Sequence, residues 1–422
     1  MIDMEAGTVY PVPSGWKVFS VNDIKSSERY ACVAGPFGSN ISAKYFVDDG
    51  VPVIRGSNLR HDLTRFVPEG LTFVSETKAQ EFVPQHVVQG DLVFTCWGTV
   101  GQVGLIPADG PYPAYIISNK QLKLRVDRSL AEPLFCFYYF ASPQYVEHIR
   151  NRGIGGAVPG INLGILKSLR IALPPLDVQR QILTILGAYD DLIENNRRRM
   201  ALLEESARLL YREWFVRLRF PGYEHTPIVD RVPQGWECKT LGDLCSEIRD
   251  MVLPEALGPD TPYIGLEHIP RRSISLNEWG TAEQVTSSKS RFKAGEIIFG
   301  KIRPYFHKVG VAFVDGVASS DAIVIRPVDE KLQGLVLMTM SSDEFVAVTA
   351  QQMKEGSKMP RADWKQMQTY SVPVPPSGLL SNFDGVIQSI VAQLRAMTFA
   401  NQKLRAARDL LLPQLMNGEI AV

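Results

Sequence analysis

A basic and aromatic segment over residues 289–308 has the clearest capacity to bind a ligand. Six lysine or arginine residues stand there against one acid, Glu296, and Phe292, Tyr305, Phe306 and Gly300 lie among them. Cations attract phosphate groups, aromatic rings can stack on planar ligands, and a glycine lets the backbone come close to a ligand. The alternative is a hairpin with a solvated charged face. The candidate binding residues of this segment are Lys289, Arg291, Lys301, Arg303, Tyr305, His307 and Lys308.

Three other kinds of polar segment could contribute the same chemistry. One follows the apolar run Val51–Ile54, where a strand end would hold a loop rigidly, one is the glycine-rich stretch Thr95–Gln102, and one precedes each of two Pro-Pro pairs. Glycines mixed with cations suit the binding of phosphate. The second could instead be a plain turn, and the third a linker kept soluble by its charge. Their candidate residues are Arg55, Ser57, Asn58, Arg60, Trp97, Thr99, Gln102, Arg150, Arg152, Lys358 and Arg361.

The elements that must position these segments occur twice in the chain. Four segments of the first half recur in the same order in the second half, and the offset falls from 220 residues to 201. It then stays at 201 to the last residue of the chain. Because surface loops accept insertions, the part with a variable offset is globular and the part with a constant offset is rigid. The matching segments are Pro13–Trp16 with Pro233–Trp236, Val51–Ile54 with Thr261–Ile264, Gly90–Phe94 with Gly295–Phe299, and Pro174-Pro175 with Pro375-Pro376.

Each repeat begins with short β-rich runs separated by glycine, proline or asparagine turns, and ends with a long helix after its Pro-Pro pair. We expect an α+β fold in which two similar domains are separated by an antiparallel two-helix coiled coil, with a pseudo-twofold internal repeat. The expected boundaries are 1–160 for the first domain, 161–230 for a central region with a helix at about 178–217, 231–365 for the second domain, and 366–422 for a C-terminal region with a helix at about 380–416.

The two helical segments carry heptad stripes. Ten positions spaced alternately four and three residues apart run from Ile182 to Trp214, and the same positions plus 201 run from Phe383 to Leu415. A strict period of about 3.5 residues predicts left-handed coiled-coil packing. The alternative is that each stripe packs against its own globular part.

The asparagines of the stripes indicate an antiparallel register. When paired residue numbers sum to 597, every stripe residue meets a stripe residue, and Asn196 lies opposite Asn401. A buried asparagine costs stability unless its amide finds a partner, so this pair would determine the register. In the same register Tyr189 would meet Arg408 in a cation–π contact.

Composition limits the class of protein. The 422 residues hold 45 Lys and Arg against 45 Asp and Glu and are 45% hydrophobic, which predicts a soluble protein of two or three folded domains. No apolar run reaches about 18 residues, so we expect no membrane span, and the first residues do not resemble a secretory signal. Five cysteines without a CxxC pair fit a reducing cytoplasm rather than a disulfide framework or a zinc site. Because the net charge is zero, any nucleic-acid contact must come from local patches.

Several motifs in combination resemble those of type I restriction–modification specificity subunits. The resemblance covers essentially the whole chain, and the order of the repeats is that of the family. Leu173–Leu176, Gln179–Ile182, Leu210–Phe215 and Phe220–Gly222 resemble the family's central conserved region. Pro233–Trp236 looks like the start of a second target-recognition domain, and Leu411–Gly418 is similar to the family's C-terminal end.

The resemblance implies a subunit that recognises double-stranded DNA and is not itself catalytic. Each target-recognition domain would read one half of a bipartite, asymmetric target, and the helices would set the number of unread base pairs between the halves. Two modification subunits would dock and methylate adenine with S-adenosylmethionine, and restriction subunits, where the system has them, would use ATP and Mg. The first Pro-Pro pair is followed by Asp177 and Gln179, as in the family, but the second is followed by Ser377–Ser381, so the docking contact could differ there.

Motifs of an intrinsic active site are missing from the sequence. An adenine methyltransferase needs an Asn/Asp-Pro-Pro-aromatic loop, whereas Leu173 and Val374 precede the two Pro-Pro pairs. There is no GxxxxGK[ST] phosphate loop, and the six histidines lack the HxH or HxxxH spacing of a metal site. We therefore expect no catalytic residue and no metal. The rival hypothesis is a coiled-coil scaffold that assembles proteins and reads no DNA; it predicts no sequence-specific retention of duplex DNA.

Overall fold

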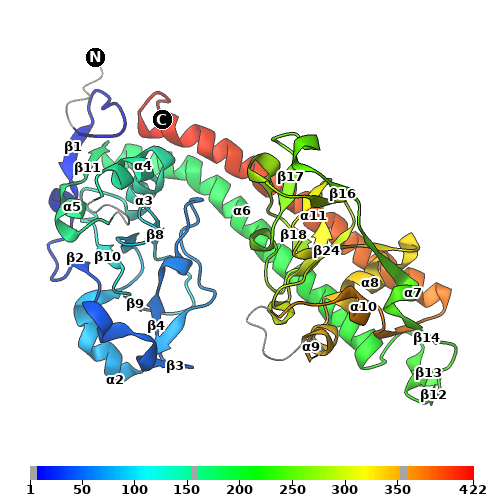
Figure 1. Cartoon of the computed structure of the whole chain (residues 1–422). Coiled ribbons are helices and arrows are strands. Elements are labelled where there is room, and N and C mark those ends of the chain that lie inside the picture. Colours follow the sequence, from blue (N-terminus) through cyan, green and yellow to red (C-terminus); the bar gives the residue numbers. More distant parts are fainter. Residues whose placement is uncertain (1–6, 154–159, 352–359) are drawn as a thin grey trace. The chain divides into compact units, whose positions relative to one another are not determined.

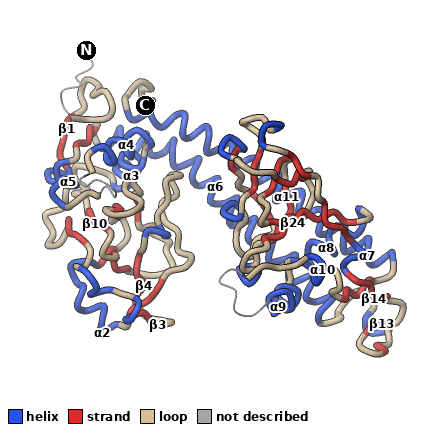
Figure 2. The backbone as a smooth tube through the Cα atoms, in the orientation of Figure 1, coloured by secondary structure: helices blue, strands red, loops and turns tan. Residues whose placement is uncertain are grey.

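The computed structural model describes residues 7–153, 160–351 and 360–422. The chain divides into two compact units, one formed by Met1–Asp191 together with Leu404–Val422 and the other by Leu192–Lys403. Short strands joined by long loops make up much of each unit, as Figure 2 shows. None of the helices within the described ranges is long and apolar enough to cross a membrane.

The first unit contains two sheets and a separate strand pair. A four-stranded sheet has the order β2-β10-β7-β8, a five-stranded sheet has the order β3-β5-β4-β9-β6, and β1 pairs with β11. The strands are β1 (Lys17–Ser20), β2 (Cys32–Ala34), β3 (Phe46–Val47), β4 (Val51–Ile54), β5 (Thr72–Val74), β6 (His86–Val87), β7 (Leu92–Thr95), β8 (Val103–Leu105), β9 (Tyr115–Ile117), β10 (Gln121–Leu124) and β11 (Arg170–Leu173). The short helices are α1 (Val21–Ile24), α2 (Glu76–Ala79), α3 (Pro133–Ala141), α4 (Pro143–Asn151) and α5 (Leu163–Ser168).

The second unit contains two five-stranded sheets and two strand pairs. The sheets have the orders β15-β24-β21-β22-β18 and β16-β20-β23-β17-β19, and the pairs are β12-β13 and β14-β25. The strands are β12 (Ile228–Val229), β13 (Val232–Pro233), β14 (Glu237–Thr240), β15 (Cys245–Ile248), β16 (Met251–Val252), β17 (Pro262–Ile264), β18 (Ser275–Leu276), β19 (Gly280–Thr281), β20 (Lys289–Phe292), β21 (Ile297–Gly300), β22 (Val309–Ala312), β23 (Gly316–Ala318), β24 (Ala322–Pro327) and β25 (Ser371–Val374). The short helices are α7 (Leu241–Leu244), α8 (Gln333–Met340), α9 (Asp343–Gln351) and α10 (Trp364–Met367).

The repeat in the sequence is also a repeat of strand pairing. β1 pairs with β11 so that Lys17 faces Leu173, and β14 pairs with β25 so that Glu237 faces Val374. β4 runs parallel to β9 as β17 runs parallel to β23, and β7 is antiparallel to β10 as β21 is to β24. The expected α+β fold with an internal repeat is therefore confirmed.

Two long helices follow the Pro-Pro pairs. They are α6 (Leu176–Tyr211), which continues as a π-helical turn over Arg212–Val216, and α11 (Ser377–Met416). Within each unit a segment of α6 lies beside a segment of α11 (Figure 1). All positions of the heptad stripes are buried or half-buried, as coiled-coil packing requires. The segment Ser377–Ser381 forms the beginning of α11.

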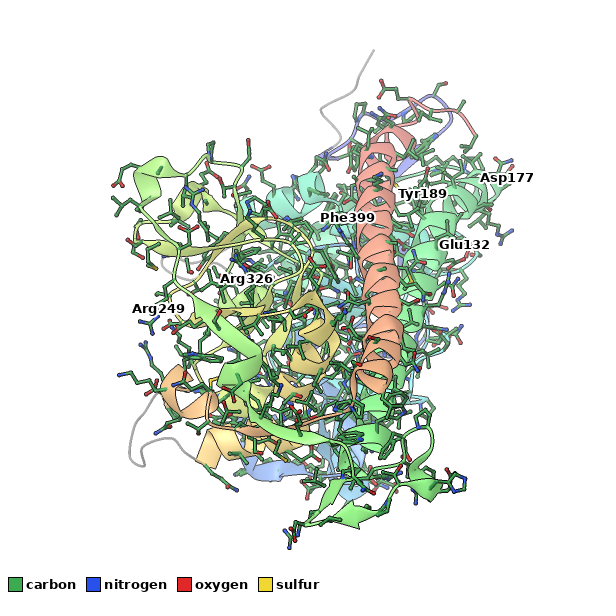
Figure 3. The ribbon with its side chains drawn as sticks, turned by 90° about the vertical axis from the view of Figure 1, so that its right-hand side faces the viewer. Glu132, Asp177, Tyr189, Arg249, Arg326 and Phe399 are labelled. Carbon is green, nitrogen blue, oxygen red and sulfur yellow. The ribbon has the colours of Figure 1, made fainter. Side chains whose placement is uncertain are left out.

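The predicted antiparallel register is present. In the second unit Asn196 Nδ2 donates to Asn401 Oδ1 at 2.8 Å, and the rings of Trp214 and Phe383 lie 5.6 Å apart. The numbers in both pairs sum to 597. Phe399 of α11, which Figure 3 labels, packs its ring 6.1 Å from Trp279 of the same unit.

An ion pair replaces the predicted contact between Tyr189 and Arg408. Nη1 of Arg408 lies 2.7 Å from Oδ1 of Asp190, one residue further along α6, and Nη2 lies 2.9 Å from Asp409. Arg408 is only 3% exposed. A guanidinium removed from water gains more from carboxylates than from an aromatic ring, so the neighbouring acid takes the arginine.

In each unit a short helix packs against α6 and α11 within the hydrophobic core. In the first unit the aromatic helix α3 buries Phe135, Phe137 and Tyr139 in a cluster that also contains Leu186 of α6 and Leu412 of α11. In the second unit α8 approaches α11 very closely: a Cβ atom at Gly334 would lie 2.9 Å from Cβ of Ile387. In each unit the globular part thus packs on the long helices through apolar side chains. This packing leaves the polar side chains of its loops to other contacts.

Candidate nucleic-acid interface

The ends of several strands converge at one edge of the first unit. Ile54 ends β4 beside Ile117 of the parallel strand β9, and Thr95 ends β7 opposite Gln121, where β10 begins. The loops that follow these strands are joined by backbone hydrogen bonds, from Ser118 N to Ile54 O at 3.1 Å and from Cys96 N to Lys120 O at 2.8 Å. We call this edge, with the loops 35–40, 55–61, 96–102 and 118–120, the first loop edge.

The three polar segments that the sequence singled out in the first half meet at this edge. Gln102 Nε2 donates to the carbonyl of Leu59 at 3.0 Å, which joins the second segment to the first. Arg150 Nε donates to the carbonyl of Val100 at 3.2 Å, and Arg150 Nη2 lies 3.2 Å from His61 Nε2. The segments therefore form one surface rather than three.

Two of the predicted binding residues are buried beneath this surface and bind its loops. Asn58 is fully buried; its Nδ2 donates to the carbonyls of Val67 at 2.8 Å and Glu69 at 3.2 Å, and its Oδ1 accepts from the N–H of Arg55. Gln102 is 9% exposed and also accepts from the hydroxyl of Thr99. Both amides are used by the protein itself, so they position the loops instead of facing a ligand.

The other predicted residues of the first unit are exposed, and the structure adds two more. Trp97 is 46% exposed and lies against Gly160, where a Cβ atom would come within 2.6 Å of the indole ring. Phe37 is 91% exposed, on a loop held by a 3.0 Å hydrogen bond from Asn119 Nδ2 to the carbonyl of Gly38. Sequence reasoning missed Phe37 because an aromatic residue normally signals a core position. The exposed set is Phe37, Arg55, Ser57, Arg60, Trp97, Thr99, Lys120, Arg150 and Arg152.

The second unit repeats this edge with the same backbone hydrogen bonds. Ser319 N donates to the carbonyl of Ile264 at 2.9 Å, and Lys301 N donates to the carbonyl of Asp321 at 2.7 Å. Ala362 N donates to the carbonyl of Lys301 at 2.9 Å, where Ile161 N donates to that of Cys96 at 3.0 Å. We call the edge formed by loops 265–272, 301–308 and 319–321 the second loop edge.

Different side chains perform the same positioning task at the two edges. Where Asn58 accepts the N–H of Arg55, His268 Nδ1 accepts the N–H of Gly265 at 3.0 Å. The Gln102 amide donates to the carbonyl of Leu59, and the ammonium of Lys308 donates to the carbonyl of Leu266, which lies in the corresponding turn but three positions earlier. The backbone geometry is thus kept while the chemistry of the side chains changes.

The second loop edge carries exposed cations and an exposed ring. Arg303 is exposed and has a φ of 52°, a region that residues other than glycine rarely adopt; its N–H donates to the carbonyl of Pro360 at 3.0 Å. Tyr305 is 49% exposed beside Phe306, and the guanidinium of Arg271 lies 3.8 Å from the centre of the Phe306 ring. Arg271 lies outside the basic segment of the sequence and was not predicted.

The basic segment 289–308 does not form one face. β20 starts near the second loop edge, since Ser290 faces Ala318, and runs away from it. Lys289 is 7% exposed and its ammonium donates to the carbonyl of Ser287 at 3.0 Å, while Arg291 is exposed in the middle of the strand. Lys289, at the start of β20, is withheld from the surface by its burial. Arg291 does not join the cations at 301–308, because the strand carries it away from the second loop edge.

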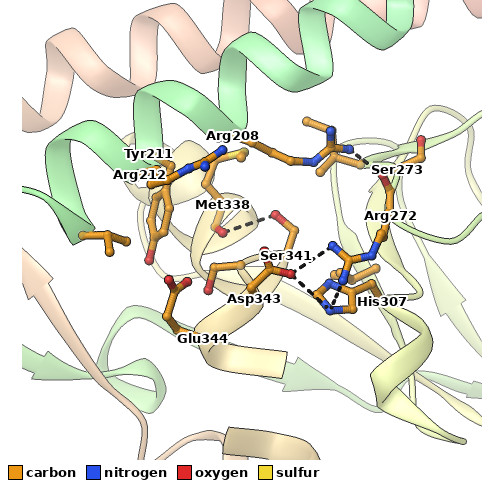
Figure 4. Close-up of a pocket in the computed structure, with 14 residues that line it drawn as sticks. Arg208, Tyr211, Arg212, Arg272, Ser273, His307, Met338, Ser341, Asp343 and Glu344 are labelled. Carbon is orange, nitrogen blue, oxygen red and sulfur yellow. Dashed lines mark hydrogen bonds and ion pairs between the residues drawn. The ribbon is translucent and has the colours of Figure 1, made fainter. Parts of the chain in front are cut away.

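His307 lies in a polar network at the base of the second loop edge. Its Nε2 is 3.4 Å from both Asp343 and Arg272, and these two form a 3.0 Å ion pair beside a cavity of about 220 Å³ (Figure 4). Burial, assisted by the charge of Arg272, lowers the pKa of His307 below its ordinary value of 6.5. The ring is 8% exposed, so it lies inside the base of the loop.

The segment before the second Pro-Pro pair is described only in part. Arg361 is exposed and forms a 3.0 Å ion pair with Asp321 of the second loop edge, whereas Lys358 lies outside the described residues. Among the residues that the structure describes, no group of three or more His, Cys, Asp or Glu side chains is arranged to hold a metal ion.

Both sequence repeats match a known family. Residues 13–205 and 233–406 match the family described as type I restriction modification DNA specificity domain. The chain is 22% identical to the MjaIX type I restriction enzyme specificity subunit of Methanocaldococcus jannaschii, over 97% of this chain and 95% of the relative. It is also 22% identical to the HindI specificity subunit of Haemophilus influenzae, over 74% of this chain and 83% of the relative. The crystal structure of a type I restriction-modification S subunit from M. genitalium has the same fold, with a TM-score of 0.55, 14% identity and coverage of 96% of both chains.

Proposed function

The chain belongs to the family of type I restriction–modification DNA specificity proteins, and we propose that it is the subunit that selects the DNA target of such a system. Because the match extends over both repeats, each unit would act as one target-recognition domain. The target would then have two parts, one for each unit, and the chain itself would be non-catalytic.

The observation that carries this proposal is the repeated loop edge. Both units hold their loops with equivalent backbone hydrogen bonds, yet the side chains offered there differ. The position of Arg55 is occupied by Gly265 in the second unit, and that of Trp97 by Ile302. Trp97 forms an isolated β-bridge with Gly160, and Ile302 forms the equivalent bridge with Arg361. Loops on a common scaffold with different side chains are expected where two domains read different base sequences.

The exposed cations and rings would make the DNA contacts. Arginine and lysine can bind phosphate or the edge of guanine, and aromatic rings can contact bases or sugars. The buried residues Asn58, Gln102, Lys289 and His307 would hold the loops in position and would not touch DNA. Arg291 is left out of the proposed contacts because of its place on β20. Among the described residues the proposed contacts are Phe37, Arg55, Ser57, Arg60, Trp97, Thr99, Lys120, Arg150, Arg152, Arg271, Lys301, Arg303, Tyr305 and Arg361. Lys308 would hold its loop as Gln102 does, and Lys358, which lies outside the described residues, stays a proposed contact on the sequence alone.

The long helices would set the gap between the two parts of the target. α6 has 36 residues and α11 has 40, and the Asn196–Asn401 pair selects one register between them. Two modification subunits would dock on the chain and methylate adenine with S-adenosylmethionine, and restriction subunits of a complete system would bind ATP and Mg. The chain would work in the cytoplasm, where its DNA is.

Mapping of methylated adenines tests this function. The chain is expressed with its modification subunits in a cell without other adenine methylation, and N6-methyladenine is mapped across the genome. We expect methylation at a motif of two defined parts separated by a gap of constant length. If the chain is a scaffold that reads no DNA, methylation will be absent or will not depend on the chain.

A further inference from the structure

In each unit a carboxylate with little exposure and an arginine, both on the long helices, hold the stretch of chain that follows a recognition loop. We infer that these residues position the loop for reading DNA; the inference rests on the proposed function. In the first unit the pair is Asp190 and Arg408, and in the second it is Glu204 and Arg208. We call each arrangement a helix clamp.

The clamp of the first unit collects three donors on one carboxylate. Asp190 Oδ1 pairs with Arg408 Nη1 at 2.7 Å, and Asp190 Oδ2 pairs with Arg65 Nη2 at 3.2 Å and accepts from the hydroxyl of Tyr138. Arg408 Nη2 also donates to the carbonyl of Asp62 at 3.1 Å. The clamp therefore holds the chain at Asp62 through its main chain and at Arg65 through its side chain.

The stretch held in this way is the direct continuation of the recognition loop. Asn58, at the base of loop 55–61, binds the carbonyl of Val67, and Val67 N donates to the carbonyl of Asn58 at 3.0 Å, so residues 58–67 form a closed loop. The carbonyl of Leu59 accepts from Gln102. Asn58 thus closes the loop at one end, and the clamp anchors its middle to the helices.

The second unit contains the same device built from other residues. Glu204 Oε1 accepts from the hydroxyl of Ser273 at 2.7 Å and from the N–H of Ser275 at 3.2 Å, and Glu204 Oε2 pairs with Arg208 at 3.3 Å. Arg208 also donates to the carbonyl of Arg272, a contact that Figure 4 shows. Arg272 is the last residue of loop 265–272, and Ser273 to Ser275 follow it directly.

The positions held by the two clamps correspond in the repeat. Asp62 and Arg272 are 210 residues apart, as are Arg65 and Ser275, and this is the offset that relates Val51–Ile54 to Thr261–Ile264. The arginine comes from α11 in the first unit and from α6 in the second. The same points of the chain are therefore held although the side chains that hold them differ, which is not expected of incidental packing.

The chemistry of the clamp suits a positioning role. Burying a carboxylate and a guanidinium adds little net stability compared with apolar residues, but hydrogen bonds determine direction as well as distance. In both clamps the arginine donates a hydrogen bond to a backbone carbonyl, that of Asp62 or that of Arg272. Because this bond is to the main chain, the side chains of the recognition loop can differ between the two edges.

Conservative variants of each clamp test the inference in the complex with the modification subunits. Asp190→Asn and Glu204→Gln keep side-chain size and remove the charge. Methylation rates are measured on duplexes that carry single base-pair changes in either half of the target. Discrimination is the ratio of the methylation rate on the target to the rate on a duplex with one changed base pair. We expect Asp190→Asn to lower this ratio by about threefold to tenfold for changes in one half of the target and to leave it unchanged for the other half. Glu204→Gln should act on the opposite half. Arg65→Gln serves as a second variant of the first clamp if Asp190→Asn does not fold.

Exposed ion pairs on the same helix provide matched controls. Arg180→Gln breaks the pair with Glu132 in the first unit, and Arg217→Gln breaks the pair with Glu213, at the end of α6, in the second. The contacts described for these two pairs involve no recognition loop. Both controls should leave discrimination unchanged. Clamp variants that lower the unfolding temperature but keep full discrimination in both halves would overturn the inference. A wild-type complex without a two-part target would instead overturn the proposed function.

Discussion

Asn196 on α6 donates to Asn401 on α11 at 2.8 Å, although 205 residues separate them in sequence. Asn401 is 6% exposed, and its neighbours on the stripe are apolar. An amide in such surroundings costs free energy unless it finds a partner, and a shift of the helices by one heptad would leave both amides unpaired. The pair therefore selects one register out of several that the apolar stripes alone would allow.

Removing one member of this pair should destabilise the second unit. Asn401→Leu leaves the amide of Asn196 facing an apolar neighbour, and we expect the free energy of unfolding to fall by about 1–3 kcal/mol in guanidinium titrations. Replacing both asparagines by leucine should recover most of that loss, because two apolar residues suit the seam. Additive effects of the two substitutions would show that the side chains do not interact.

Arg303 should contribute one phosphate contact at the second loop edge. Arg303→Ala is expected to weaken binding of target duplex and to reduce the slope of log affinity against log salt by about one. Arg291→Ala is the matched control and should leave the slope unchanged, because Arg291 lies two residues beyond the end of β20 that is nearest the second loop edge. Equal slopes for Arg303→Ala and the wild type would remove Arg303 from the phosphate contacts.

Phe37 should matter for DNA binding and not for folding. The ring is 91% exposed, so Phe37→Ser removes almost no buried surface and should leave the unfolding temperature unchanged. Covering even part of a phenyl ring on DNA is worth about 1 kcal/mol, which predicts a loss of affinity of about fivefold. Phe345, which is fully buried in the second unit, offers the contrast: Phe345→Ser should unfold the protein. Unchanged affinity in Phe37→Ser would place the ring off the DNA.

Acid should destabilise the second unit through His307. Burial lowers the pKa of His307 below 6.5, so the unfolded state binds a proton more readily than the folded state. Stability therefore falls as the pH drops from about 6.5 towards the folded pKa, and His307→Gln should reduce that loss. Burial also lowers the pKa of His61 and His148, so some pH dependence should remain in the variant. Denaturant titrations at several pH values measure the free energy of unfolding of the wild type and of His307→Gln. If both proteins lose stability equally as the pH falls, His307 is not a source of the acid sensitivity.

Periodic features could be predicted from the sequence because they reflect the packing of long elements. The heptad stripes gave the helix pairing and the Asn196–Asn401 contact, and the repeated segments gave the paired strands of both units. Arg408 was paired with the wrong partner, because the stripe alone does not show that Asp190 lies one residue further along and carries a charge.

The polar loops can be recognised in the sequence, but which of their side chains are exposed cannot. Asn58 and Gln102 have polar side chains that suggest exposure, yet buried backbone carbonyls need donors and take both amides. The basic segment places Lys289 with Lys301, whereas the Lys289 side chain is buried and donates to the carbonyl of Ser287. Which loops meet in space depends on strand pairing, and no local pattern reports it.

Shortening both long helices by one heptad tests most directly the claim that two readers are held at a set distance. Deleting Arg197–Leu203 from α6 and Leu394–Ala400 from α11 keeps Asn196 opposite Asn401, because the paired numbers still sum to 597. Seven residues of helix span about 10 Å, or about three base pairs of DNA. Mapping of methylated adenines should show both parts of the target unchanged and the gap between them shorter by about three base pairs. An unchanged gap, or new sequences in either part, would contradict the account.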